Sequence, residues 1–181
     1  MRRLRILDVC AGSGSATQAF CDHGHEVDTL DIIGNHTHVC DVRDFIPQKN
    51  YDFVWASPPC MEFSLADYRK GKCRDRHPDM SIVDACIRIC KTAPFWLMEN
   101  PRGCLRHFIG LPAISIRYGD FGYAYQKPTD LWGVFPFDAL YRPHHPKTFA
   151  LLQNDSLGKK NRRCVPYELS LVVCETLEML F

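Results

Sequence analysis

Short apolar runs recur along the chain and alternate with stretches of helical or polar character. Runs rich in β-branched and aromatic residues predict strands at residues 4–10, 25–32, 37–45, 51–57, 93–100, 113–122 and 129–135. Helical patterns lie at residues 11–24, 79–91 and 165–180. Strands that alternate with helices predict an α/β domain with a mostly parallel central sheet and helices on both faces.

Size and composition fit one globular domain that spans residues 1–181. Of the 181 residues, 46% are hydrophobic and 24% charged, which is enough to bury a core without disulfides or metals. No apolar run approaches the roughly 20 residues of a membrane span. The basic start MRRLRILDVCAGSG holds an apolar stretch that is too short for a signal peptide. We therefore expect a cytoplasmic protein that does not associate with membranes.

The chain has ten cysteines, several of them inside apolar runs. Without a secretion signal, they are expected to be reduced residues of the core. There is no C-x-x-C pair, which argues against a zinc ribbon. Cys86 and Cys90 could share one face of a helix, but no second pair of ligands accompanies them. We therefore expect no metal site.

The net charge of +1 is uninformative, but basic residues gather in two segments. Residues 69–76 hold five bases and one acid, and residues 142–163 hold six bases and one acid. Such segments contact phosphate groups in some proteins and are solvated loops in others, and the pattern leaves both open.

Candidate chemical groups follow five of the predicted strands. These groups are a glycine loop, Asp31, Asp41, a Pro-Pro-Cys sequence and a Glu-Asn-Pro sequence. Ligands of open α/β sheets bind at the carboxyl ends of the strands, so the pattern places these groups on one rim.

The sequence AGSGS after the first predicted strand lets a ligand approach the backbone and exposes amides at a helix start. Asp31 lies where an acid can accept hydrogen bonds from ribose hydroxyls. Thr17 stands where a dinucleotide-binding loop has its third glycine, which favours an adenosyl group over a diphosphate. Asp41 is a candidate acceptor for the adenine amine. The glycines taken alone also fit a simple tight turn.

Two prolines precede Cys60 in the sequence SPPC. Proline fixes φ, so the segment is stiff and holds the Cys60 thiol in one orientation. A thiolate is an effective nucleophile. The alternative is a buried structural cysteine. Glu99 ends an apolar strand, where a carboxyl group can protonate a ring nitrogen or hold it by a hydrogen bond. The alternative is that Glu99 has only a structural role, as a helix cap or in a salt bridge.

The motifs LDVCAGSG, SPPCMEFS, LMENP, QKPTDLWG and RCVPYEL, with the two acids, resemble in order the DNA cytosine-C5 methyltransferases, closest to the short phage-type members. The resemblance spans nearly the whole chain and implies the Rossmann-like fold of enzymes that use S-adenosylmethionine. It implies that Cys60 attacks C6 of a cytosine flipped out of DNA, that Glu99 holds N3, and that Asn100 orients the cysteine loop.

The resemblance also implies sets of binding residues. The expected cofactor-binding residues are Cys10, Ala11, Gly12, Ser13, Gly14, Asp31, Ile32, Asp41, Val42 and Pro59. The expected substrate contacts are Ser64, Arg69, Lys70, Lys72, Arg74, Lys159 and Lys160. Residues 63–80 would form a mobile loop that closes over the base.

Two departures from the family pattern bear on the substrate. The family's Q-x-R-x-R is replaced by QKPTD, in which Lys127 and Thr129 are the best stand-ins for the arginines. A short basic insert, residues 134–163, stands in place of a target-recognition domain. The rivals are therefore the same chemistry on a free nucleotide or RNA, and an inactive cofactor-binding module that regulates a partner. A dimer or a partner chain is a further possible source of target recognition.

Overall fold

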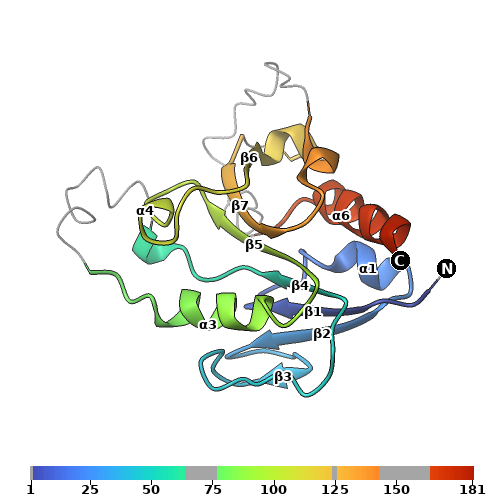
Figure 1. Cartoon of the computed structure of the whole chain (residues 1–181), viewed down its shortest axis with the longest axis horizontal. Coiled ribbons are helices and arrows are strands. Elements are labelled where there is room, and N and C mark those ends of the chain that lie inside the picture. The colour runs from blue at the N-terminus through green and yellow to red at the C-terminus, as the bar shows by residue number, and fades with distance from the viewer. Residues whose placement is uncertain (1, 64–76, 124–125, 143–163) are drawn as a thin grey trace.

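The computed structural model describes residues 2–63, 77–123, 126–142 and 164–181 (Figure 1). Its centre is a seven-stranded sheet in the order β3-β2-β1-β4-β5-β7-β6. The strands are β1 (Arg5–Val9), β2 (Glu26–Asp31), β3 (His38–Val39), β4 (Phe53–Ala56), β5 (Phe95–Pro101), β6 (Ile114–Arg117) and β7 (Pro128–Val134). The helices are α1 (Gln18–Asp22), α3 (Ser81–Cys90), α4 (Arg106–Ile109) and α6 (Tyr167–Leu180), with 3-10 turns η1 (Met61–Phe63), η2 (Tyr118–Phe121) and η3 (Phe137–Leu140).

The sheet is mixed and mostly parallel, as the alternating pattern predicted. Strands β1 to β5 pair in parallel, but β7 lies antiparallel between β5 and β6. The short connection from β6 through η2 to β7 favours antiparallel pairing, because a parallel crossover needs a dozen or more residues. The predicted α/β fold with a mostly parallel central sheet is therefore confirmed, and β7 is the strand that runs antiparallel to its neighbours.

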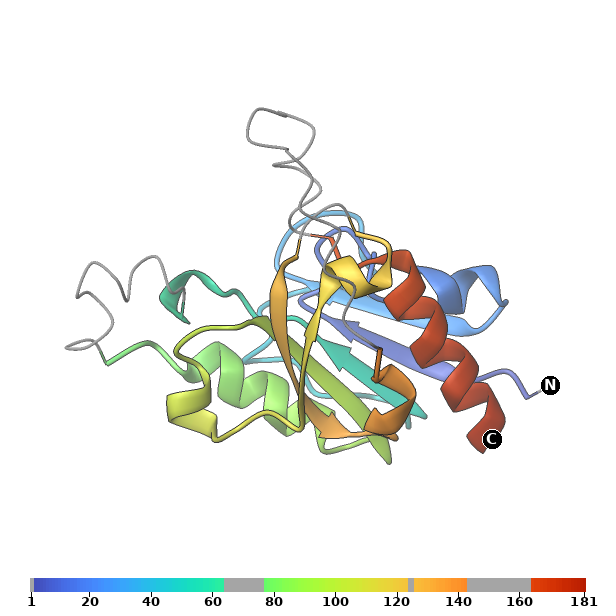
Figure 2. The same cartoon turned by 90° about the horizontal axis from the view of Figure 1, so that it is seen from above.

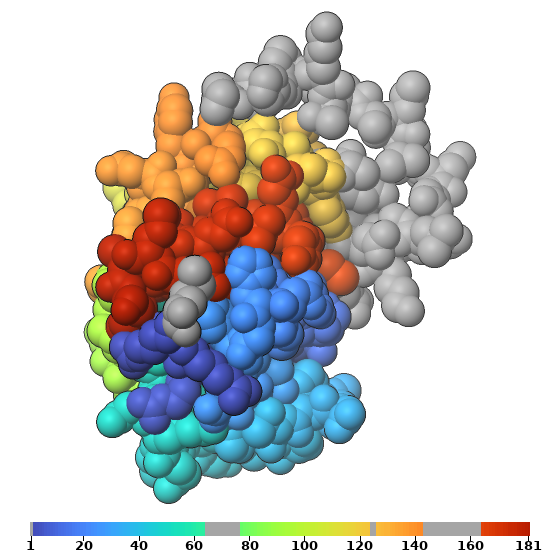
Figure 3. Space-filling model, turned by 90° about the vertical axis from the view of Figure 1, so that its right-hand side faces the viewer, coloured from blue at the N-terminus to red at the C-terminus, as the bar shows by residue number. Residues whose placement is uncertain are grey.

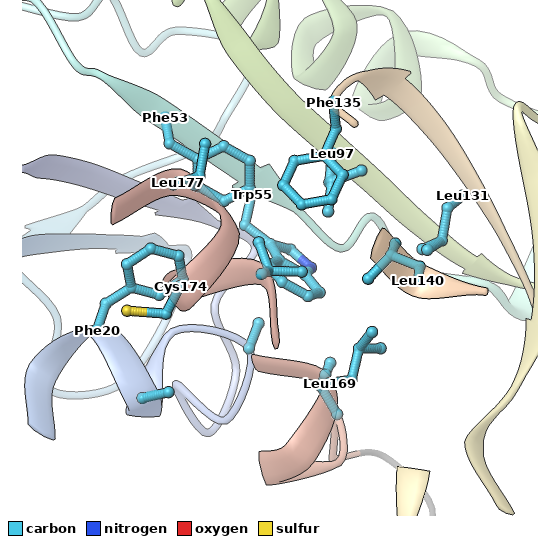
Figure 4. Close-up of a cluster of buried hydrophobic side chains, with 14 of the residues drawn as sticks. Phe20, Phe53, Trp55, Leu97, Leu131, Phe135, Leu140, Leu169, Cys174 and Leu177 are labelled. Carbon is cyan, nitrogen blue, oxygen red and sulfur yellow. The ribbon is translucent and has the colours of Figure 1, made fainter. Parts of the chain in front are cut away.

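Helices cover both faces of the sheet, as predicted. Figure 2 shows α3 and α6 on opposite sides of it. On the α6 side, α1 and α6 pack over a core built around Trp55, part of which Figure 4 shows. On the α3 side, Val83, Cys86 and Ile89 pack on β4 and β5. Strands β1 and β4 alternate between the two cores and are buried on both faces, which explains their continuous apolar runs.

The predicted strand 113–122 is only β6, and η2 follows it. Two further elements are also shorter than predicted. The predicted strand 37–45 pairs over only His38–Val39, because the chain turns away from β2 after that residue. The predicted helix 11–24 becomes helical only at Gln18, since turns built on the glycines fill residues 11–17. Both differences lie at the carboxyl rim, where backbone amides are left to face a ligand.

No helix within the described ranges is long and apolar enough to cross a membrane. Nine cysteines lie in these ranges, none of them in a disulfide, and four are buried. Most cysteines were expected in the core, but five of the nine described ones lie outside it.

Candidate active site

The glycine loop leaves β1 through left-handed backbone conformations. Cys10, Gly12 and Gly14 have φ values of 57°, 53° and 72°. The two glycines tolerate this conformation, whereas Cys10 is strained in it. Asp31 anchors the loop, because its carboxylate accepts hydrogen bonds from the Gly12 amide at 2.9 Å and the Ile32 amide at 2.7 Å. A side chain predicted to bind ribose is therefore also the support of the loop beside it.

Two cavities lie at this rim, and Asp31 lines both. One, of about 620 Å³, is lined by the loop and the segment after β2: Gly12, Ser13, Gly14, Thr29, Asp31, Ile33, Gly34, Asn35 and His36. The other, of about 210 Å³, has largely apolar walls: Cys10, Leu30, Asp31, Ile32, Cys40, Asp41, Val42, Arg43, Ser57, Pro59 and Ile82. Of the expected cofactor-binding residues, all but Ala11 line one of these cavities; Ala11 is buried in the loop.

Asp41 lines the smaller cavity and is paired with a neighbouring arginine. Its carboxylate forms an ion pair with Arg43 and accepts a hydrogen bond from the Arg43 backbone amide at 2.9 Å. These bonds lower the pKa of Asp41 to about 2. The sequence led us to expect that Asp41 accepts a hydrogen bond from the adenine amine, and that role stays a prediction. The sequence did not indicate Arg43 as a partner of Asp41. The orphaned polar atom of this cavity is instead Ser57 Oγ, which is buried without a hydrogen-bond partner among the described residues.

A buried carboxyl lies beneath the glycine loop. Asp8, on β1, is fully buried and accepts one hydrogen bond, at 2.8 Å, from the Thr17 hydroxyl. Its second oxygen has no partner among the described residues. Burial raises the pKa of Asp8 to about 7. Thr17, which replaces the third glycine, thus ties the start of α1 to β1.

The loop that carries Cys60 is fastened on three sides. The Ser57 amide donates to the Val9 carbonyl at 2.9 Å, and the Asn100 side-chain amide donates to the Pro58 carbonyl at 3.0 Å. Beyond Cys60, the Phe63 carbonyl accepts from the Cys104 amide at 2.9 Å. Cys60 itself is half-buried at the rim.

Glu99 and Asn100 point to opposite faces of β5, because successive side chains of a strand alternate. The Glu99 carboxylate accepts a hydrogen bond from the Tyr118 hydroxyl at 2.8 Å, and Lys127 Nζ lies 3.7 Å away. The same ammonium lies 4.5 Å from the centre of the Tyr118 ring. Burial, and then the Glu99 charge, raise the pKa of Tyr118 well above its usual range, which keeps the hydroxyl a donor.

Of the two stand-ins for the missing arginines, only Lys127 supplies a charge beside Glu99. Thr129 is fully buried behind it, and its hydroxyl donates to the Lys127 carbonyl at 3.3 Å. Sequence reasoning missed Tyr118, since a tyrosine at the end of a strand carries no motif. The β6–η2 corner brings it to Glu99.

Asp130 occupies a position where the family pattern has an arginine. It is fully buried. Arg106 of α4 donates hydrogen bonds to both of its carboxylate oxygens, and the Ser115 hydroxyl donates to one of them at 2.7 Å. Asp130 faces Asn100 across the β5–β7 pair. This charge pair therefore fixes α4 against β7, the strand that pairs with β5 at Asn100.

The expected substrate contacts Ser64, Arg69, Lys70, Lys72, Arg74, Lys159 and Lys160 lie outside the described residues, as do most of the expected mobile loop and of the insert 134–163.

The fold is similar to that of known methyltransferases. A structure of the Entamoeba histolytica methyltransferase EhMeth matches with a TM-score of 0.53 and 12% identity, over 76% of this chain and 55% of that chain. The glycopeptide N-methyltransferase MtfA matches with a TM-score of 0.45 and 13% identity, over 75% of this chain and 85% of that chain, a similarity too low to carry an argument. No family model and no curated protein matches the sequence.

The similarity to EhMeth shows the class of fold and does not show the activity. The chain has the seven-stranded α/β fold of the S-adenosylmethionine-dependent methyltransferases. It spans about half the length of EhMeth.

Proposed function

We propose that the chain is an S-adenosylmethionine-dependent methyltransferase that methylates C5 of cytosine in DNA, with Cys60 as its nucleophile. The observation that carries the proposal is the fastening of the Cys60 loop by Asn100, at the strand end where Glu99 is held by Tyr118 and Lys127. A nucleophile and a ring-holding acid on adjacent strand ends suit addition to a pyrimidine.

The chemistry of the two cavities fits the cofactor. The apolar walls around Pro59 and Ile82 suit a flat adenine ring, and Ser57 Oγ is a polar atom that lacks a partner there. Asp31 would accept from ribose hydroxyls, while the amides of the glycine loop would face the amino-acid end. When bound, S-adenosylmethionine supplies an electrophilic methyl group.

Cys60 would act on the ring carbon that activates C5. Its thiolate forms a bond to C6, which places electron density on C5 and lets that carbon accept the methyl group. When the C5 proton leaves to a base, the bond between Sγ and C6 breaks and the thiolate returns. The prolines before Cys60 and the bond from Asn100 keep the sulfur in line with one carbon of a planar ring.

Glu99 would hold the target ring at N3 and stabilise the charge that develops there when C6 is attacked. Tyr118 donates to one carboxylate oxygen and so fixes the rotamer of Glu99. Lys127 would take the place of the missing arginine beside the base. The target cytosine must leave the duplex to reach these groups, and the basic residues 69–74 and 159–160 are proposed to hold its backbone.

A second candidate is the same chemistry on a free pyrimidine nucleotide. Two observations favour it: the insert 134–163 is short, and Arg106 is engaged with Asp130. A polynucleotide substrate would bind with affinity that falls steeply as salt rises, whereas a free nucleotide would show a shallow dependence.

The proposal is tested by trapping the covalent adduct. Duplex DNA that carries 5-fluorocytosine is incubated with the protein and cofactor, because fluorine at C5 blocks the final elimination. We expect a denaturation-resistant complex in which Cys60 is the modified residue. Cys104→Ser, which changes a buried cysteine beyond the loop, should still form the complex. No adduct, with cofactor bound, would overturn the proposal of a DNA substrate and favour the free nucleotide or a regulatory module.

A further inference from the structure

A cluster of potential metal ligands lies at the opposite end of the sheet from Cys60, between the end of α1 and the face of α6. His23 follows α1, and Gly24, with φ of 78°, turns the chain so that His25 also faces α6. Cys174 and Glu178 are four residues apart on α6, one turn from each other. Figure 3 shows the red surface of α6 adjoining the blue surface of the N-terminal part of the chain on this side.

The carboxylate of Glu178 is the centre of the cluster. Its Oε1 lies 3.0 Å from His23 Nδ1 and 3.0 Å from His25 Nε2. His25 Nδ1 accepts a hydrogen bond from the Leu4 amide at 3.3 Å. A neutral imidazole that accepts at Nδ1 carries its proton on Nε2, so His25 donates to Glu178. His25 therefore orients the carboxylate, and His23 contacts the same oxygen from the more exposed side.

We propose that His23, Cys174 and Glu178 bind one divalent transition-metal ion, of which zinc fits the donor set best. A ligand atom from each residue lies within 4.8 Å of the other two. Tetrahedral zinc with bonds of about 2.0–2.3 Å holds its ligand atoms roughly 3.3–3.8 Å apart, so side-chain shifts of about 1 Å close the site. An imidazole, a thiolate and a carboxylate are the ligand types that zinc selects over magnesium or calcium.

Burial of the three ligands suits a site with one open position. Cys174 is fully buried and lies beside Phe20 in the core, as Figure 4 shows. The Glu178 side chain is 9% exposed and that of His23 is 30% exposed. An ion would therefore have protein on one side and water on the other, with water as its fourth ligand. The bond from His25 supplies the outer-sphere support that metal-bound carboxylates usually have.

The alternative is a purely ionic cluster in which the two histidines pair with Glu178. That reading explains the two 3.0 Å contacts, but it gives no role to the Cys174 sulfur beside them. A bound ion would join the α1–β2 turn to the C-terminal helix. Strand β1, of five residues, separates this end of the sheet from the rim by roughly 15 Å. The inference is thus independent of the proposed methyl transfer.

The expectation of no metal came from spacing along the chain, which cannot bring residue 23 to residues 174–178. The fold does so by packing α6 on α1.

The test is a titration of the chelator-treated full chain with Co²⁺ alone, followed by absorbance. We expect saturation at one equivalent, visible d–d bands of a four-coordinate ion and a thiolate-to-cobalt charge-transfer band. Cys174→Ser should remove the charge-transfer band. Cys21→Ser, which changes an exposed cysteine on α1 near His23, should keep it. An unchanged band in Cys174→Ser, or no saturable binding, would overturn the proposal.

A second variant keeps the test decisive if Cys174→Ser fails to fold. His23→Gln alters a partly exposed side chain, and it should weaken Co²⁺ binding at least tenfold. Zinc at about a hundred times its Kd should raise the Tm of the unaltered chain by roughly 5–10 °C and that of His23→Gln by much less. Equal affinities and equal shifts in both proteins would contradict the assignment, whatever the methylation assays give.

Discussion

Gly103 lies where the segment after β5 passes the Cys60 loop, and a side chain at this position would push the loop away. A Cβ built on Gly103 would lie 2.1 Å from the Phe63 carbonyl oxygen. Because such contacts essentially never fall under 3.0 Å, Gly103→Ala must displace one of the two segments by about 1 Å. A shift of that size at a nucleophile costs on the order of a hundredfold in rate.

The variant should therefore lose kcat by about a hundredfold while S-adenosylmethionine binds within about threefold of its normal affinity. Strain and the weakened bond between the Cys104 amide and Phe63 should also cost about 1–3 kcal/mol in the free energy of unfolding. Single-turnover methylation, cofactor titration and thermal unfolding measure the three effects. Leu111→Ala, at a position 81% exposed on the following stretch, is the control. A Gly103→Ala variant with normal kcat would refute the reasoning that this contact positions the loop.

Three further predictions follow from the site. Tyr118→Phe should lower kcat about tenfold with little change in the cofactor Kd, since Glu99 loses a 2.8 Å hydrogen bond; an unchanged kcat would contradict that role. The pKa of Asp8 is raised to about 7, so the folded protein keeps a proton that the unfolded chain releases near pH 4. The free energy of unfolding should therefore fall as the pH rises from about 4 to about 7. Asp8→Asn should remove up to about 4 kcal/mol of that fall. Urea unfolding measures it, and parallel pH profiles for the unaltered chain and the variant would refute it. Cys60→Ser should abolish methylation and leave the cofactor Kd within about tenfold, so retained turnover would refute the nucleophile.

The sequence predicts most of the strands and the functional groups that follow directly at their ends. Apolar runs locate the strands, and the rule that ligands bind at carboxyl strand ends brings the glycine loop, Asp31, Cys60 and Glu99 to one rim. Such features depend on local patterns and on one general property of open sheets. The same reasoning fails for β7, because nothing in its own residues says that it enters between β5 and β6.

Contacts between distant side chains could not be predicted. The Tyr118–Glu99 bond and the Arg106–Asp130 pair join segments whose approach is set by the β6–β7 pairing. Arg43 reaches Asp41 from only two residues away, yet an isolated acid–base pair in a turn gives no signal of which partner it chooses. The exposed Arg43–Asp41 pair is individually weak, and the two buried contacts depend on tertiary packing, so no local sequence pattern specifies any of them.

The central claim is that the protein methylates C5 of cytosine in DNA and that Cys60 is its nucleophile. Its most direct test is incubation with tritium-labelled S-adenosylmethionine and, separately, duplex DNA, single-stranded DNA or free deoxycytidine nucleotides, followed by digestion to nucleosides. We predict label in 5-methylcytosine from DNA with the unaltered chain and none with Cys60→Ser. Label in the free nucleotide alone would move the enzyme to nucleotide modification. No label on any substrate, with cofactor bound, would contradict the account.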